Sequence, residues 1–264
     1  MSWIAAYLAS GLVIGLLAGL LGIGGGLTLV PVLSALLAAQ ATAPDHVLHL
    51  ALGTAMAAVL FTGASSAREH HRLGSVDWAV VKQLGPAMAL GTLMASLASG
   101  MLPQRALSLA FAAIAAVAAT QMWIGRKPAA QRGLPGAAGL WSVGVGIGVV
   151  CGLVSAGGTF MTLPFMLWCG VPMRTAIGTA AALGLPVAAF GTAGYVISGW
   201  GVAGLPAGTV GFVLLPALVP VVLASMVMAP VGARLSHRLP VATLRRIFAL
   251  VLYALAAKMA LAYA

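Results

Sequence analysis

Gly19-Leu-Leu-Gly-Ile-Gly-Gly-Gly-Leu-Thr-Leu-Val-Pro31 is the stretch that decides the fold, because its glycines interrupt an otherwise apolar sequence. A second stretch, Gly152-Leu-Val-Ser-Ala-Gly-Gly-Thr-Phe-Met-Thr-Leu-Pro164, aligns on it without a gap. Glycine populates backbone conformations that end a helix, so each stretch is expected to break one. The duplication therefore predicts two equivalent helix breaks, each with an apolar run before it and a shorter apolar run after it.

The composition around these stretches is that of a membrane protein. Of the 264 residues, 62% are apolar and 6% are charged, and the mean hydropathy is +1.10. An average soluble protein has about a quarter of its residues charged, so the lipid bilayer is the solvent that suits most of this side-chain surface. The net charge of +10 lies in short loops between apolar runs, which indicates orientation signals and no nucleic-acid partner.

Ten apolar runs predict an all-α polytopic membrane protein. Because a spanning helix needs about 20 residues, the runs Leu27–Ala39 and Phe160–Cys169 are too short to cross a bilayer and predict half-helices. The other predicted segments are Trp3–Leu21, Val47–Ser66, Ala79–Gly100, Ala106–Ile124, Leu140–Val154, Thr175–Ser198, Ala207–Val231 and Val241–Ala262.

Two further landmarks repeat in the same order as the glycine stretches. Ala51-Leu-Gly-Thr-Ala55 matches Ala176-Ile-Gly-Thr-Ala180, and Leu102-Pro103 matches Leu239-Pro240. Three landmarks in one order indicate a duplicated half. The predicted division is residues 1–125 for the first membrane repeat, residues 126–138 for a cytoplasmic linker and residues 139–264 for the second membrane repeat.

Charge decides how the two halves are oriented. If each glycine-broken pair of runs counts as one crossing, the halves are parallel and the 13 Lys and Arg residues divide seven to six. If each broken pair instead returns to the side it left, eleven lie on one side and only Arg105 and Lys258 on the other. The second division is the one that the positive-inside rule expects. Each half is then a glycine-broken helical hairpin plus three spanning helices, the second half is inverted, and both termini lie outside.

The two breaks form the predicted substrate site. In inverted-repeat transporters, paired breaks of this kind mark the substrate site near the bilayer midplane. A half-helix that begins after the glycines points free N–H groups and a positive dipole end at the break, which favours an anion. The candidate ligands at the breaks are Gly22, Gly24, Gly25, Gly26, Thr28, Ser155, Gly157, Gly158 and Thr159.

The repeated Thr54 and Thr179 are candidates for a further symmetric pair of substrate-binding hydroxyls. The alternative for all these positions is that small residues let helices pack closely, as in Gly11-x-x-x-Gly15-x-x-x-Gly19. This alternative is the better interpretation for the two threonines and the glycines before them. Pro31 and Pro164 are expected near the first turn of each half-helix, where the missing N–H of proline costs little.

Ionisable side chains are scarce. Asp45, Glu69 and Asp77 are the only carboxylates and are all expected in loops, so no intramembrane carboxylate is available as a proton relay or cation site. The five histidines lie at or near segment ends; His49 is expected at the membrane interface without a transport role, although it could face a vestibule. Neither cysteine has metal or disulfide spacing, and no metal, cofactor or catalytic residue is predicted.

The two glycine stretches and the later Gly-Thr elements resemble the sulfite exporter TauE/SafE family of bacterial inner-membrane permeases. The likeness extends through the repeat over nearly the whole chain, and the first copy carries it more specifically than the second. The resemblance implies a multi-pass protein of the bacterial inner membrane that carries small anions. It further implies sulfite, sulfonates and related organosulfur compounds as substrates, usually moved by export.

The sequence therefore predicts a secondary transporter that binds a small anion between the breaks and works by alternating access. It contains no GxxxxGK[ST] motif and so no nucleotide-driven motor of its own. A passive anion channel is one alternative. An intramembrane enzyme with Ser155 as nucleophile and His237 as base is the other, although Ser155 lacks the GxSxG context. A homo-oligomer is compatible with the sequence.

Overall fold

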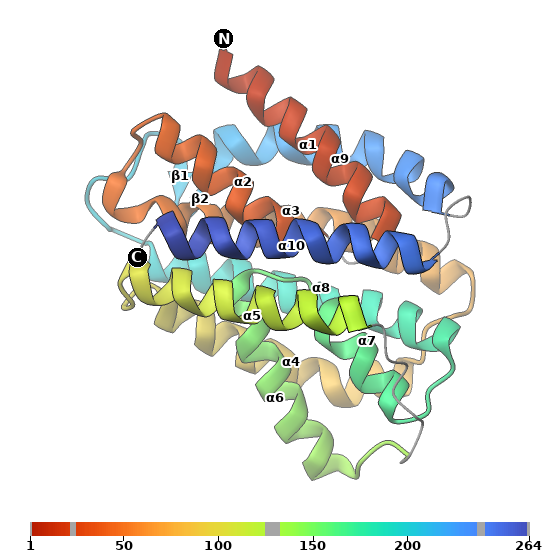
Figure 1. Ribbon diagram of the computed structural model, residues 1–264. Helices are drawn as coiled ribbons and strands as arrows, with labels where there is room; N and C mark the ends of the chain where they lie inside the picture. The colour runs from red at the N-terminus through yellow and green to blue at the C-terminus, as the bar shows by residue number, and fades with distance from the viewer. Residues whose placement is uncertain (1, 22–24, 125–132, 237–240, 263–264) are drawn as a thin grey trace.

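The computed structural model describes residues 2–21, 25–124, 133–236 and 241–262 (Figure 1). Within these ranges the chain forms ten α-helices, one 3-10 turn and one two-stranded hairpin. The elements are α1 (Ser2–Leu21), α2 (Gly26–Ala39), η1 (Pro44–His46), α3 (Val47–Arg72), α4 (Trp78–Ser99), α5 (Gln104–Ile124), α6 (Ala137–Val154), α7 (Thr159–Trp168), α8 (Met173–Ser198), β1 (Thr209–Val210), β2 (Val213–Leu214), α9 (Leu215–Ser236) and α10 (Val241–Ala262).

The helices have the lengths expected of a membrane bundle. Four segments are long and apolar enough to cross a bilayer, namely η1 with α3, and α5, α6 and α8. The helices that follow the glycine stretches are short, with 14 residues in α2 and 10 in α7. The predictions of an all-α membrane protein and of two short helices after the breaks are therefore confirmed.

The segment before α9 differs from the prediction. The sequence predicts one apolar segment over Ala207–Val231, whereas β1 pairs antiparallel with β2 before α9 begins at Leu215. Gly211 lies in the turn between the strands with φ of +57°, a conformation that glycine adopts without a steric penalty. The apolar residues on either side of this glycine are suited to strand as well as to helix, so hydropathy alone did not reveal the hairpin.

One smaller expectation is also wrong, and a second is met only approximately. Glu69 does not lie in a loop, because α3 continues for six residues beyond Ser66 and ends at Arg72. Pro31 and Pro164, expected near the first turn, each occupy the sixth position of their helix, just beyond that turn. A proline at the sixth position cannot donate a hydrogen bond to the carbonyl oxygen one turn earlier, so the second turn of each short helix is weakened.

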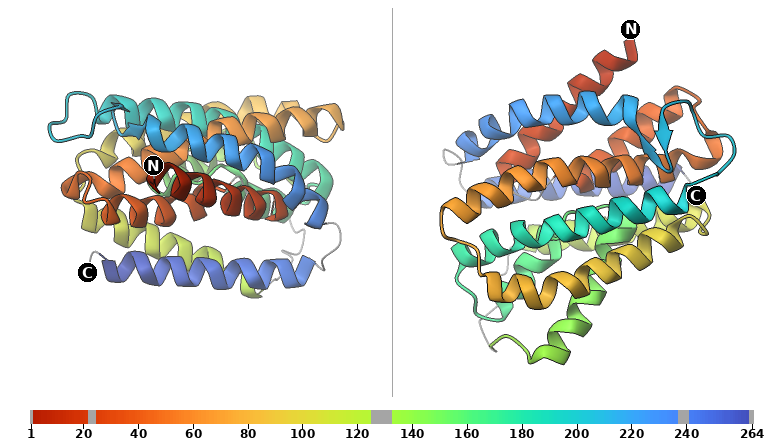
Figure 2. Two further views of the ribbon diagram at one scale, coloured as in Figure 1. Left: turned by 90° about the horizontal axis from the view of Figure 1, so that it is seen from above. Right: turned by 180° about the vertical axis from the view of Figure 1, so that it is seen from behind.

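The two halves of the chain interlock helix by helix. α1 packs along α9, α6 along α4, α3 along α8 and α5 along α10, so each of these pairs joins one helix from each predicted half. α1 and α6 are the first helices of their halves, and α9 and α4 are the fourth. Figure 2 shows α3 and α8 side by side and antiparallel. The pairing is unchanged when the two halves are exchanged.

The short helices run in opposite directions. Figure 1 shows α2 running from the middle of the bundle to the end where the β1–β2 hairpin and the α4–α5 turn lie. α7 runs from the middle to the opposite end, where α8 begins. The α1–α2 and α6–α7 hairpins therefore open toward opposite ends of the bundle.

A glycine ridge on α1 lets it approach α9 closely. A Cβ placed on Gly11 would lie 2.7 Å from the carbonyl oxygen of Val221, and one on Gly15 would lie 2.6 Å from the backbone of Ser225. Real Cβ atoms do not approach backbone atoms this closely, so only glycine fits at these two positions. The predicted close packing of Gly11 and Gly15 is confirmed, whereas the surroundings of Gly19 lie outside the description.

The equivalent ridge on α6 packs against α4. In the gapless alignment of the glycine stretches, Gly148 is equivalent to Gly15. A Cβ on Gly148 would overlap the carbonyl oxygen of Met88 and lie 2.9 Å from the backbone nitrogen of Thr92. Both first helices thus use the same face, at the same register, to contact the fourth helix of the other half.

Replacing one ridge glycine tests this packing. Gly148→Ala is expected to lower the free energy of unfolding by about 1–3 kcal/mol, because the added methyl group overpacks the α4–α6 contact. Gly146→Ala on the same helix is the matched control, since Gly146 is exposed and its Cβ would meet no atom within 4 Å. Thermal unfolding in detergent measures the difference, and equal midpoints for the two variants would contradict the ridge.

Candidate substrate site

The first break is closed by hydrogen bonds to Gly25. This residue has φ of +70° and lies directly before α2, which begins at Gly26. Its carbonyl oxygen accepts the N–H of Leu29 at 3.0 Å and the hydroxyl of Thr28 at 2.8 Å. The Thr28 hydroxyl therefore donates within the first turn of α2. The candidates Gly22 and Gly24 lie outside the described residues.

The second break begins at Ser155, a fully buried residue with φ of +50°. This conformation costs a non-glycine residue about 1–2 kcal/mol. The hydroxyl of Ser155 donates to the carbonyl oxygen of Leu52 in α3 at 2.7 Å, which fixes the break on α3. A hydroxyl that donates to a carbonyl is not paired with a base, and His237, the base of the enzyme alternative, lies outside the described residues.

The two breaks are in direct contact. A Cβ on Gly26 would overlap the carbonyl oxygen of Ser155 and lie 2.7 Å from the side chain of Val59 in α3. Only a residue without a side chain can occupy this position. Sequence reasoning proposed both breaks for one site, and the structure brings Gly26 and Ser155 together beside α3.

The rest of the second break packs against α4 and α8. Gly157, Gly158 and Thr159 are buried. A Cβ on Gly158 would lie 2.9 Å from the terminal methyl group of Met88 and 3.7 Å from the backbone nitrogen of Gly184. The contact with Met88 involves the flexible end of a side chain, whereas Gly26 meets backbone. The two glycines therefore differ in how much added volume they tolerate.

The electrostatics of the breaks come from the backbone. Neither break contains a charged side chain. In the first turns, the N–H of Thr28 already bonds the carbonyl oxygen of Gly25 at 3.2 Å, and the N–H of Phe160 bonds that of Gly157 at 3.4 Å. The other first-turn N–H groups of α2 and α7 have no partner within their own helix, and each helix N-terminus carries roughly half a positive charge. Buried donors of this kind favour an anion, and the low local dielectric strengthens the interaction. The breaks are thus suited to a small anion without a fixed countercharge.

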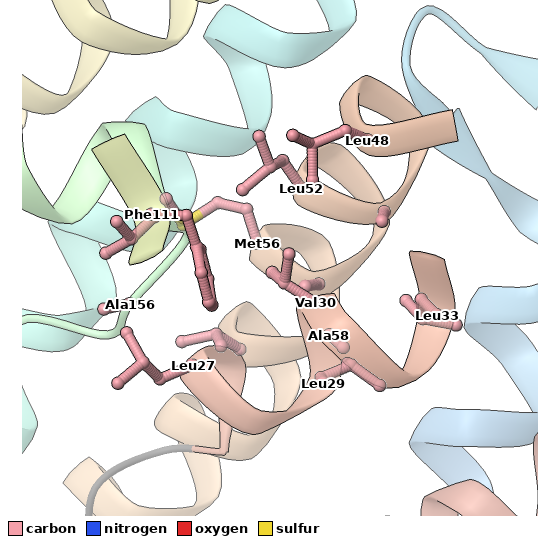
Figure 3. Close-up of a cluster of buried hydrophobic side chains, with 14 of the residues drawn as sticks. Leu27, Leu29, Val30, Leu33, Leu48, Leu52, Met56, Ala58, Phe111 and Ala156 are labelled. Carbon is pink, nitrogen blue, oxygen red and sulfur yellow. The ribbon is translucent and has the colours of Figure 1, made fainter. Parts of the chain in front are cut away.

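Apolar side chains cover the junction of the breaks. Figure 3 shows Leu27 of α2, Met56 of α3 and Phe111 of α5 gathered with Ala156 of the second break. All four are buried. In this conformation the junction is closed, and an anion reaches it only if these side chains or the helices that carry them move.

A small cavity beside the first break has a different character. It lies between α1, α3 and α9, and its lining is almost entirely apolar. The hydroxyl of Thr62 donates to the carbonyl oxygen of Val59 at 3.3 Å, and that of Ser225 to the carbonyl oxygen of Val222 at 3.0 Å. The polar hydrogens that line the cavity are therefore already used, and the cavity itself offers an anion little.

Thr54 and Thr179 make equivalent contacts away from the breaks. The hydroxyl oxygen of Thr54 accepts the N–H of Leu214 at 2.9 Å, and that of Thr179 accepts the N–H of Asp77 at 2.9 Å. Each donor lies directly before the fourth helix of the other half. These hydrogen bonds support the packing interpretation, and a substrate-binding role for the two hydroxyls stays a prediction.

The glycines before these threonines behave alike. A Cβ on Gly53 would overlap the carbonyl oxygen of Phe212, and one on Gly178 would overlap that of Ser75. Phe212 and Ser75 each lie two residues before the donor that reaches the following threonine. Each Gly-Thr pair therefore holds one loop of the other half by close contact and one hydrogen bond.

The burial of His49 was missed by sequence reasoning, which placed it at the interface. Its side chain is 4% exposed, and its Nε2 atom lies 3.0 Å from the carbonyl oxygen of Ser99 and 3.2 Å from that of Leu102. Phe212 of the β1–β2 hairpin lies over the ring, with centroids 4.9 Å apart. Because the sequence did not reveal the hairpin, it gave no signal for this cover.

Comparison with known proteins identifies relatives along the whole chain. Residues 7–259 match the family described as "Sulfite exporter TauE/SafE". A protein of Haemophilus influenzae named "Probable membrane transporter protein" is 34% identical over 260 residues, which cover 98% of each chain. The "Probable membrane transporter protein YdhB" of Bacillus subtilis is 25% identical over 240 residues, covering 88% of this chain and 90% of its own. No solved structure matches.

Valine and serine substitutions separate the two roles of the threonines. Thr54→Val leaves the buried N–H of Leu214 without its acceptor and is expected to lower the free energy of unfolding by about 1–3 kcal/mol. Thr54→Ser keeps the hydroxyl and is expected to retain most of the stability. Thermal unfolding provides the measurement. Weaker anion binding at unchanged stability would instead assign the hydroxyl to the substrate.

Proposed function

Because the chain belongs to the sulfite exporter TauE/SafE family, we propose that it is a secondary transporter that exports small anions across the bacterial inner membrane. Its family and relatives make it a membrane transporter. The finer proposal is that the anion binds near the midplane, between the two glycine breaks. The main observation in favour of this proposal is the contact between Gly26 and Ser155, which brings the two helix breaks together at one buried point.

The chemistry of the junction favours an oxyanion of sulfur. A sulfite or sulfonate group presents several acceptor oxygens, and two helix N-termini supply several N–H donors. The apolar side chains of Leu27, Met56 and Phe111 beside the breaks suit the carbon part of an organic sulfonate. Binding by N–H groups alone, without a buried cation, also permits the release that transport requires.

The packing supports the inverted repeat that the charge distribution predicts. The helix pairs are unchanged when the halves are exchanged, and the α1–α2 and α6–α7 hairpins open toward opposite ends. The Gly-Thr contacts and the glycine ridges also occur once in each half, at equivalent positions. We take each glycine-broken pair to return to the side from which it enters.

The tryptophans agree with this orientation. Tryptophan is enriched at both membrane–water interfaces. All six tryptophans are exposed and lie near helix ends or, for Trp200, just after one. Four fall at the end proposed to be cytoplasmic and two at the outer end. These are Trp78, Trp123, Trp141 and Trp168 on the inner side, and Trp3 and Trp200 on the outer side.

Alternating access then follows from the symmetry. In inverted-repeat transporters, one repeat or bundle rocks against the other around a fixed midplane site. Here the antiparallel α3–α8 pair lies next to both breaks, and the α1–α9 and α4–α6 pairs flank it. Exchange of the roles of the two halves converts a conformation open at one end into a conformation open at the other.

Cysteine accessibility tests the orientation. After Cys151 and Cys169 are replaced by alanine, Ala203→Cys is expected to react with an impermeant thiol reagent from outside. Gly133→Cys is expected to react only from the cytoplasm. Both positions are exposed. A parallel repeat places both on the same side, so labelling of both from one face would contradict the inversion.

Alanine at the second break tests the site. Gly158→Ala is expected to weaken binding of sulfite or sulfoacetate by about 1–3 kcal/mol, because the methyl group obstructs approach to the N–H groups. The fold should tolerate it, since the only close contact of the methyl group is with the flexible end of Met88, while Val187 and Gly184 lie at ordinary contact distance. Thr159→Val is expected to show a smaller loss, and Gly146→Ala no loss.

Calorimetry gives the affinities, and proteoliposomes give the flux of sulfite, sulfoacetate, taurine, sulfate and acetate. Wild-type affinity in both break variants would move the site away from the breaks. Flux that follows the anion gradient alone, without coupling, would favour a passive channel over a carrier.

A further inference from the structure

His49 lies at a junction of three elements near the outer end of the bundle. It belongs to the first turn of α3, and Phe212 of the hairpin covers it. Its Nε2 atom contacts the carbonyl oxygen of Ser99 at the end of α4 and that of Leu102 in the α4–α5 turn. Among the described residues it is the only buried histidine. Gly53 and Thr54, one turn further along α3, hold the same hairpin against the helix.

The two nitrogens of the His49 ring have different surroundings. Both partners of Nε2 are carbonyl oxygens, which only accept hydrogen bonds, so Nε2 carries the hydrogen. The other nitrogen, Nδ1, is buried and has no hydrogen-bond partner among the described residues. A buried polar atom without a partner is costly and calls for an explanation. Since Nε2 is already protonated, Nδ1 is the atom at which the ring takes up a further proton.

We propose that His49 is a proton-binding site of the transport cycle, loaded at Nδ1 while the β1–β2 hairpin is displaced and closed off when the hairpin packs back. The proposal rests on the proposed transport function. The proton comes from water at the outer end and binds the Nδ1 lone pair, so the ring gains one positive charge. Because the ring is only 4% exposed, loading and release each require movement of its cover. Proton binding is thereby linked to the conformation of the outer end.

The surroundings support a proton that is held but releasable. The carbonyl of Ser99 belongs to the C-terminal end of α4, and that of Leu102 to the α4–α5 turn. The negative end of a helix dipole stabilises a protonated histidine. The ring of His46 lies 5.8 Å away, edge to face, and its own Nδ1 is also without a described partner.

Few other charges lie near the ring. η1 contributes Asp45 beside His46, and α5 begins with Gln104, which binds the backbone N–H of Leu48, followed by the exposed Arg105. Residues 199–214, which form the cover, contain no charged residue, and neither does the end of α4. The breaks hold no carboxylate or histidine, and among the described residues His49 is the buried histidine that can take up a proton within the closed bundle.

The test compares His49→Gln with His71→Gln. Glutamine keeps a donor for the two carbonyls but cannot take up a proton. Transport of methanesulfonate, whose charge is constant between pH 5 and 8, is measured in proteoliposomes together with proton flux. Wild-type and His71→Gln rates are expected to change by about tenfold per pH unit on one limb, as for a single ionisation. His49→Gln is expected to lose this dependence and the coupled proton flux.

Imidazole ¹⁵N NMR of the detergent-solubilised protein measures the protonation of His49 independently of transport. The His49 signal is expected to show only Nε2–H at high pH and to gain a second N–H as the pH is lowered. A signal that never gains the second N–H overturns the proposal, as does a His49→Gln variant with the wild-type pH profile. If no anion is transported by the wild type, the proposed function fails, and the NMR titration still decides whether His49 binds a proton.

Discussion

Interrupted backbone at the centre of an apolar bundle is the constraint on which this structure depends. Each break frees N–H and carbonyl groups that lipid cannot satisfy, so the breaks have to be buried against protein. Gly26 against the carbonyl oxygen of Ser155, and the Ser155 hydroxyl on Leu52, show how the chain meets this requirement. The interlocked pairing of α1 with α9 and of α6 with α4 follows, because it encloses both breaks between helices of the other half.

Much of the fold could be predicted because its determinants are local. The lengths of the apolar runs and the glycines between them predicted α2 and α7 to within two residues at each end. The repeat also paired Thr54 with Thr179, and the structure gives them matching hydrogen bonds. What the repeat did not reveal is the partner of each threonine, because Leu214 and Asp77 lie far away in the sequence and donate from the backbone, which carries no sequence signal.

The parts that were missed depend on long-range contacts. Hydropathy did not distinguish the β1–β2 hairpin from the helix that follows it. The burial of His49 was missed for the same reason, because Phe212 of this hairpin covers the His49 ring. Pro31 and Pro164 lie in the second turn of their helices, because α2 and α7 each begin five residues before the proline. A proline in the second turn weakens a helix, which places a compliant point in each short helix close to the break.

An inverted repeat with identical halves would give the two faces of the membrane equal energies, so any preference of the transporter for one face has to come from differences between the halves. Two such differences lie at equivalent positions. His49 in α3 aligns with Arg174 in α8, which is exposed and permanently charged. The loop that contacts Gly178 runs only from Leu73 to Asp77, whereas Gly53 is contacted by the longer segment that contains β1 and β2. The breaks themselves bear no ionisable group, so these two differences between the halves lie at the ends of α3 and α8 and not at the breaks.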